Sequence, residues 1–128
     1  MTIRVLNIVA TAYRGTLEEQ DDTVLWLTSM CGAAGLDVAV LLEGNAVNYA
    51  ARGQDSSGLR FGAATLAHPP SLDHDIETML AKGLPVTYVA DDAERLGLDE
   101  GALVGGVKPV ALADLPSLFD GFDLIWRW

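Results

Sequence analysis

Short runs of apolar, largely β-branched residues alternate along this chain with segments of helical periodicity. Each run is long enough for a strand and too short for a buried helix. Parallel neighbours in a sheet need a crossover between them, which a helix usually supplies. The alternation therefore predicts an α/β fold: a three-layer α/β/α domain with a five-stranded, mainly parallel sheet in a flavodoxin-like layout. The expected strands are Arg4–Ala10, Asp37–Leu42, Pro85–Ala90, Val107–Leu112 and Asp123–Trp128.

The longest helix is expected over Leu17–Ala34, after a possible N-cap at Thr16, and Gly35 follows as a C-terminal glycine. Its inward face is expected to comprise Leu17, Val24, Leu27 and Cys31.

A second helix is expected after Ser71 as its cap, closed by Lys82-Gly83, with Leu72, Ile76, Met79 and Leu80 facing inward. Three shorter helices are also expected. The first covers 46–51, the second begins after Asp91 or Asp92 as its N-cap and ends at Gly97, and the third covers 113–119. The segment 54–70, with Gly58, Gly62 and two prolines, is the least regular, and loops of that length are often functional.

The balance of charge excludes several classes of partner. The chain has 128 residues, with 8 Lys and Arg against 18 Asp and Glu, for a net charge of −10. A chain of this length is expected to form a single domain, residues 1–128. Its acidic charge is expected to keep it from binding nucleic acid or an anionic membrane directly. No apolar run approaches the length of a membrane span, and the apolar start is too short and interrupted for a secretory signal. We expect a cytoplasmic protein.

Ligands of open parallel sheets bind outside the carboxyl ends of the strands. Three loops leave strand ends here, at Thr11–Thr16, Glu43–Val47 and 90–92. A pocket for a small anion or metabolite is therefore expected there, lined by Tyr13, Arg14, Gly15, Asn45 and Asp91.

Several kinds of catalytic or cofactor site are excluded by their motifs. Thr11–Thr16 has a single glycine, so it is neither a dinucleotide fingerprint nor a phosphate loop, and no cofactor is expected. His74 is expected to be a surface residue, and no metal site is supported. Asp91 and Asp92 follow a strand as in receiver domains, but the acidic pair such a domain needs after its first strand is missing.

The single thiol and the aromatic residues have both structural and functional interpretations. Cys31 is expected to be a core residue, because its helical place near a C-terminus disfavours the reactive thiolate. Trp126 and Trp128 share one side of the last strand, either in the core or in a subunit interface. Further candidates for packing against a partner are Tyr49, Leu59 and Phe61.

The order of these segments resembles the DsrE/DsrF-like (TusC/TusD-like) sulfur-relay family along nearly the whole chain. Similar segments are Ala12-Tyr13-Arg14-Gly15-Thr16 after the first strand, DVAVLLEGNAVNYAARGQ (Asp37–Gln54), VTYVADDAERLGL (Val86–Leu98) and the closing LFDGFDLIWRW (Leu118–Trp128). The resemblance implies a small cytoplasmic subunit of an assembly that passes persulfide sulfur between proteins.

The same resemblance places the family's sulfur-carrying cysteine at about Val89, which also adds Val89 to the expected pocket. Valine cannot form a persulfide. The chain is therefore interpreted as a non-catalytic member: a subunit or small-ligand-binding protein, working as a homo-oligomer or with a related cysteine-bearing subunit. The alternative is a sulfurtransferase or persulfide carrier that uses Cys31.

Overall fold

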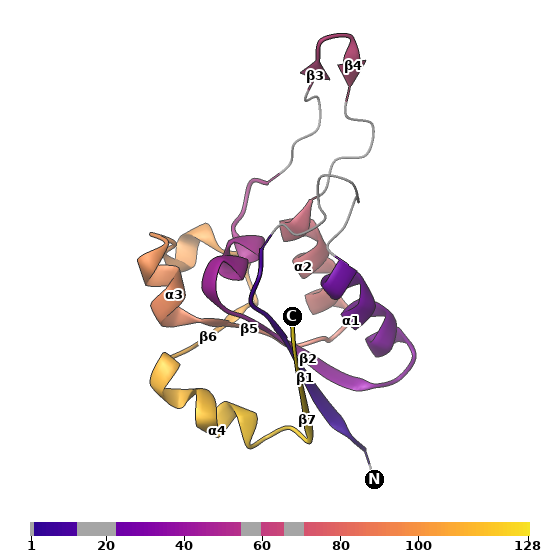
Figure 1. Ribbon diagram of the computed structural model, residues 1–128, viewed down its shortest axis with the longest axis vertical. Coiled ribbons are helices and arrows are strands. Elements are labelled where there is room, and N and C mark those ends of the chain that lie inside the picture. The colour runs from indigo at the N-terminus through magenta and orange to yellow at the C-terminus, as the bar shows by residue number, and fades with distance from the viewer. Residues whose placement is uncertain (1, 13–22, 55–59, 66–70) are drawn as a thin grey trace.

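A computed structural model describes residues 2–12, 23–54, 60–65 and 71–128 of the chain. Its main sheet has five parallel strands in the order β6-β5-β2-β1-β7 (Figure 1). This arrangement confirms the expected three-layer α/β fold. The strands are β1 (Arg4–Val9), β2 (Asp37–Leu42), β5 (Val86–Val89), β6 (Lys108–Val110) and β7 (Leu124–Arg127).

Helices connect the strands, as parallel pairing requires. The α-helices are α1 (Thr23–Ala33), α2 (Leu72–Ala81), α3 (Ala90–Arg95) and α4 (Leu115–Phe119). The 3₁₀ turns are η1 (Gly44–Ala50), η2 (Glu100–Ala102) and η3 (Leu112–Asp114).

The core lies on both faces of the sheet because side chains alternate along each strand. Val5 and Val9 of β1 face the larger cluster, which α1, α2, α3 and η1 cover, whereas Leu6 and Ile8 face a smaller cluster under α4. The central β2 is nearly continuous in apolar residues because both of its faces are covered.

Several expectations about local packing were wrong. The deepest side chains of α1 are Leu25 and Thr28, while Leu27 is half-buried outside the core cluster. Tyr49 is fully buried in the core and is therefore not a surface for a partner. Cys31, by contrast, packs against the main cluster as expected, although its side chain is only half-buried.

The expected N-caps are confirmed only in part. Ser71 is the N-cap residue of α2, but its hydroxyl donates to the Asp73 side chain rather than accepting from a backbone N–H of the helix. The residue preceding α3 is Val89, and both Asp91 and Asp92 lie within the first turn of that helix. Thr16 and Leu17 lie outside the described residues.

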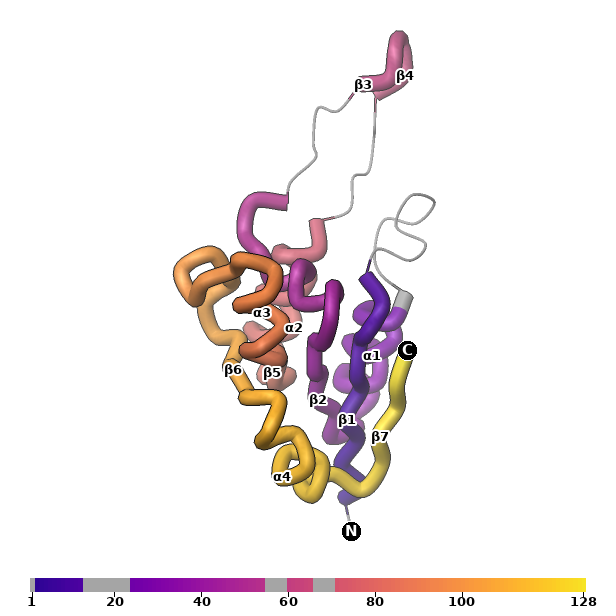
Figure 2. The backbone as a smooth tube through the Cα atoms, turned by 60° about the vertical axis from the view of Figure 1, so that its left-hand side comes forward, coloured from indigo at the N-terminus to yellow at the C-terminus, as the bar shows by residue number. Residues whose placement is uncertain are grey.

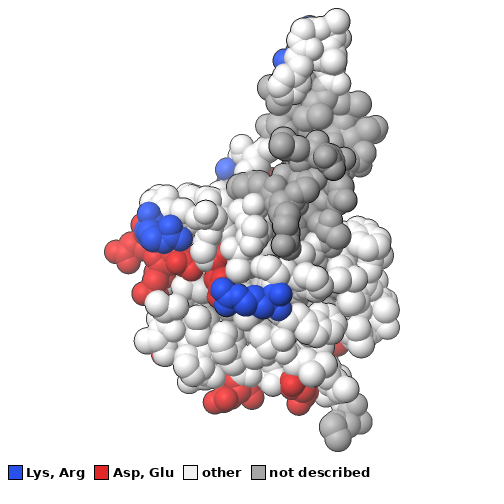
Figure 3. All heavy atoms as spheres, viewed as in Figure 1, with Lys and Arg blue, Asp and Glu red and all other residues white. Residues whose placement is uncertain are grey.

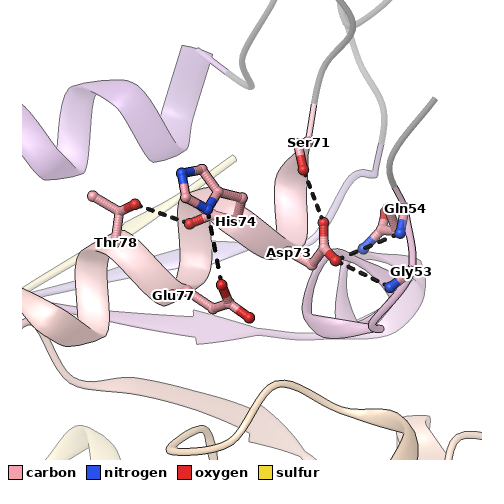
Figure 4. A network of polar contacts seen from close by, with 7 residues as sticks. All are labelled: Gly53, Gln54, Ser71, Asp73, His74, Glu77 and Thr78. Atoms are coloured by element: carbon pink, nitrogen blue, oxygen red, sulfur yellow. Dashed lines mark hydrogen bonds and ion pairs between the residues drawn. The ribbon is translucent and has the colours of Figure 1, made fainter. Parts of the chain in front are cut away.

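A hairpin, β3 (Arg60–Phe61) and β4 (Ala64–Thr65), lies within the segment expected to be irregular and stands apart from the sheet (Figure 2). Asp73 bonds the backbone N–H groups of Gly53 and Gln54, at 3.0 and 3.5 Å, so it joins the two ends of this excursion (Figure 4). The two ends of the segment that contains the hairpin, at Gly53 and at Asp73, are therefore held together.

A buried polar network joins β1, α1 and β7. Asn7, which is 1% exposed, donates its amide N–H to Thr28 and accepts from the indole N–H of Trp128. Thr28 in turn donates to the carbonyl of Val24 at 2.8 Å. A buried amide costs free energy unless it is hydrogen-bonded, so the network fixes β7 and α1 relative to β1.

The variant Thr28→Val tests this network. Valine keeps the side-chain shape but leaves the buried Asn7 amide without its acceptor, so the free energy of unfolding is expected to fall by about 1–3 kcal/mol. The matched control is Thr78→Val, a half-buried threonine with the same bond to a carbonyl four residues back, at 3.0 Å, for which a loss under about 0.5 kcal/mol is expected. Equal losses in urea denaturation would contradict the assignment.

Candidate functional site at the carboxyl edge of the sheet

The carboxyl ends of β1, β2 and β5 lie beside one another, because these three strands are neighbours in the sheet (Figure 1). The strand order reverses between β1 and β7. Such reversals are where ligands of open α/β sheets usually bind. The carboxyl edge is therefore the region in which to look for a functional site.

Two carboxylates at the end of β5 connect it to the segments that follow both neighbouring strands. Asp92 accepts a hydrogen bond from the backbone N–H of Gly44, after β2, at 2.7 Å. Asp91 accepts one from the N–H of Leu112, after β6, at 2.8 Å. Gly44 has a φ of +57°, a left-handed conformation that favours glycine and turns its N–H toward Asp92. These acids hold the edge together.

A second polar contact crosses the sheet from β2 to β7. Glu43, directly after β2, forms an ion pair with Arg127 of β7, and the Glu43 side chain is only 14% exposed. The N–H of Glu43 donates to the carbonyl of Val9 at 3.0 Å. Three acidic side chains at this edge thus bind groups of the chain itself, a role that sequence periodicity gives no means of detecting.

The described residues of the expected pocket differ in exposure. Asn45 and Asp91 are exposed at the edge, next to the bonded pair Gly44 and Asp92. Val89 is fully buried, and its side chain packs in the smaller core cluster under α4. Tyr13, Arg14 and Gly15 lie outside the described residues.

A depression that the sequence did not indicate lies beside α3. Tyr88, Ala90 and Glu94 contribute to its lining, together with Ala93, Gly97, Leu98 and Asp99. Burial, with a smaller contribution from the charge of Glu100, raises the pKa of the Tyr88 hydroxyl above its usual value of 10.0.

Cys31 lies far from this edge. The chain enters α1 after the carboxyl end of β1 and leaves it before the start of β2, so α1 leads back toward the opposite edge. Cys31 is eight residues beyond Thr23, about 12 Å along the helix at 1.5 Å per residue. Its neighbours Gly32 and Ala33 line a depression with Pro85, at the start of β5. The thiol and the carboxyl edge are therefore separate sites.

On the face drawn in Figure 3, some basic groups lie beside acidic ones and others stand apart, and the basic groups form no continuous stripe. Within the described ranges, no group of three or more His, Cys, Asp and Glu side chains is placed to hold a metal ion. Across the same ranges, no helix has the length and apolar character needed to span a bilayer.

Three solved structures share this fold over nearly the whole chain. The ychN protein from E. coli matches with a TM-score of 0.75 at 18% identity, covering 99% of this chain and all of that one. Proteins of unknown function from Methanobacterium thermoautotrophicum and Bacteroides thetaiotaomicron match with TM-scores of 0.62 and 0.66, at 16% and 14% identity. The first of these covers 98% of this chain and 99% of its own, and the second 97% and 94%.

No protein-family model matches the chain, and a comparison with curated proteins gives no significant match. The structural likeness supports a DsrE-like fold, as the sequence resemblance implied. At 14–18% identity it concerns the fold alone.

The raised pKa of Tyr88 predicts how stability changes in alkali. The folded state holds the phenolic proton more tightly than the unfolded chain, so this stabilisation is complete below pH 10 and is lost as the pH rises through the folded-state pKa. The free energy of unfolding is therefore expected to fall above pH 10. The variant Tyr88→Phe should show a shallower fall in urea denaturation between pH 9 and 11, and an identical slope would contradict the prediction.

Proposed function

We propose that this chain is a non-catalytic member of the DsrE/DsrF-like sulfur-relay family that works as a subunit of an oligomeric assembly in the cytoplasm. The observation that carries the proposal is the absence of a thiol where β5 meets α3. Val89 and Ala90 occupy this place, and Cys31 lies on α1 toward the opposite edge of the sheet.

The chemistry of sulfur transfer explains why the missing thiol at the end of β5 matters for function. The attacking species is a thiolate, and both the donor and the acceptor protein must be able to reach it. Cys31 is half-buried against the main core, so an incoming persulfide has restricted access to its sulfur. Val89 and Ala90 have no nucleophilic atom. The carboxylates nearby bond backbone N–H groups and cannot replace a sulfur carrier.

Exposed apolar side chains support the assembly part of the proposal. The exposed large hydrophobic residues include Trp26 and Met30 on one face of α1, Phe61 on the β3–β4 hairpin, and Leu124, Ile125 and Trp128 at the end of the chain. The pair on α1 and the group at the end of the chain each give apolar surface by which a protein can bind other proteins. The partners we propose are further copies of this chain or a related cysteine-bearing subunit.

Alkylation of Cys31 by iodoacetamide tests the proposal. The folded protein is expected to react at least about ten times more slowly than the urea-unfolded chain, since the Cys31 side chain packs against the core and must await local opening. The reference variant is Cys31→Ser with Ala90→Cys, which moves the single thiol to the first residue of α3, where it lines the Tyr88 depression and a helix N-terminus favours the thiolate.

This reference variant is expected to react faster than the native protein and to take up sulfur from a persulfide donor, measured by intact-protein mass spectrometry. Rapid, stoichiometric labelling of folded Cys31, followed by sulfur transfer from it, would support the persulfide-carrier alternative and overturn the proposal.

A second candidate function is binding of a small anion or metabolite at the carboxyl edge. Asn45 and Asp91 are exposed beside the Gly44–Asp92 contact, and the proposed pocket also includes Tyr13, Arg14 and Gly15. Arg14 provides the forked donor that carboxylates and phosphates favour. Val89 is buried in the core cluster under α4, so its side chain is not a ligand contact.

Thermal-shift measurements with inorganic phosphate, sulfate and acetate test the second candidate. At least one of these anions is expected to raise the unfolding temperature, and Arg14→Ala should abolish the shift while Arg60→Ala, on the β3–β4 hairpin, leaves it unchanged. Equal shifts in all three proteins would exclude the site.

A further inference from the structure

The strand β7 forms one edge of the sheet and is not covered on its outer side by another strand of the described chain. Leu124 and Ile125 are 46% and 43% exposed, and Trp128 is 41% exposed. Soluble proteins usually protect such an edge with charged side chains, above all lysine, with proline, a bulge or a covering loop, or by keeping the strand short. The sequence Asp123–Trp128 contains neither lysine nor proline, and its two charges flank the apolar Leu124–Trp126, which is therefore open to pairing with another strand.

The backbone bonds to β1 determine which groups face outward. Trp128 donates its N–H to the carbonyl of Ile8 and accepts the N–H of Ala10, both at 3.0 Å, so its two backbone groups face β1. Successive residues of a strand point these groups to opposite sides. Trp126 therefore also faces β1, while the N–H and carbonyl groups of Ile125 and Arg127 point away from the sheet.

We propose that β7 pairs antiparallel with the β7 strand of a second copy of this chain, about a two-fold axis at Ile125. This register places Ile125 opposite itself, where the two copies exchange two backbone hydrogen bonds. It also places Arg127 opposite Asp123 of the second copy, once on each side of the axis, and Leu124 opposite Trp126. A two-fold interface must be self-complementary in this way.

Charge and geometry together select this register. A shift of one residue would set outward-pointing backbone groups against groups already bonded to β1. A shift of two would set Arg127 against the apolar Ile125 and lose both ion pairs. In the proposed register, Arg127, which pairs through Nη2 with Glu43, lies opposite the exposed Asp123, whose Oδ2 accepts the N–H of Arg4 at 2.8 Å. Opposite charges directly across an antiparallel pair stabilise it, and a guanidinium has further N–H donors besides the one that faces Glu43. The second copy of the chain is therefore a better occupant than an unrelated strand.

A cysteine at the axis tests both the interface and its register. In a Cys31→Ser background, Ile125→Cys places two thiols on residues whose Cα atoms are about 5.5 Å apart, within the range of a disulfide. Mild oxidation is expected to give a disulfide-linked dimer at least about ten times faster than in the control Leu112→Cys. Leu112 is also an exposed leucine-sized residue, but it follows β6 at the opposite edge. Equal rates of cross-linking in the two variants would overturn the proposal.

Light scattering of the unmodified sequence provides a second, independent test. The protein is expected to contain a dimeric unit that Ile125→Lys disrupts, because two lysines would meet at the axis, while Leu112→Lys preserves it. Circular dichroism verifies that both variants are folded. A monomeric native protein, or an assembly unaffected by Ile125→Lys, would refute the interface.

This inference rests on the assembly part of the proposed function but can fail separately from it. The reactivity of Cys31 and of the Ala90→Cys variant does not depend on pairing at β7. A slow Cys31 thiol in a protein without a β7 dimer would therefore refute the interface alone.

Discussion

The hydrogen bond between the Asp92 carboxylate and the N–H of Gly44 determines what the carboxyl edge of this sheet can do. It fixes the segment after β2 against the first turn of α3, and Asp91 does the same for the segment after β6. The acids that would otherwise be available for chemistry therefore stabilise the edge itself. The residues at the end of β5, Val89 and Ala90, have no nucleophile to add. Among the described residues, the end of β5 thus contributes no nucleophile to this edge, which is the premise of the proposed function.

The periodicity of the sequence was sufficient to predict the class of fold. Apolar runs identified the five strands to within one or two residues, and Gly35, Gly83 and Gly97, all with positive φ, marked the ends of the three longer helices. The order of the strands could not be predicted, because periodicity identifies elements but not their neighbours. Leu27 was misassigned for a related reason: α1 is apolar almost all round, so its sequence hardly distinguishes an inner face.

Long-range polar contacts were beyond sequence reasoning altogether. The sequence predicted that Asp91 or Asp92 caps a helix, because an acidic residue at a helix start is a local pattern. Their actual partners lie 21 and 48 residues away, where a local pattern gives no information. The network of Asn7 and the raised pKa of Tyr88 likewise depend on burial that only the tertiary structure creates. The exposed edge of β7 is a further case: the sequence left Trp126 and Trp128 equally compatible with a core and an interface. In the structure, Trp126 packs against the core, and Trp128 is 41% exposed.

The most direct test of the central claim is the transfer of sulfane sulfur by the folded native protein. The protein is incubated with a persulfide donor, freed of it, and mixed with an acceptor thiol, and intact-mass spectrometry follows the sulfur at each stage. The account predicts that folded protein gains no sulfur atom at Cys31 and delivers none to the acceptor. Stoichiometric loading of Cys31, with delivery that disappears in Cys31→Ser, would contradict it.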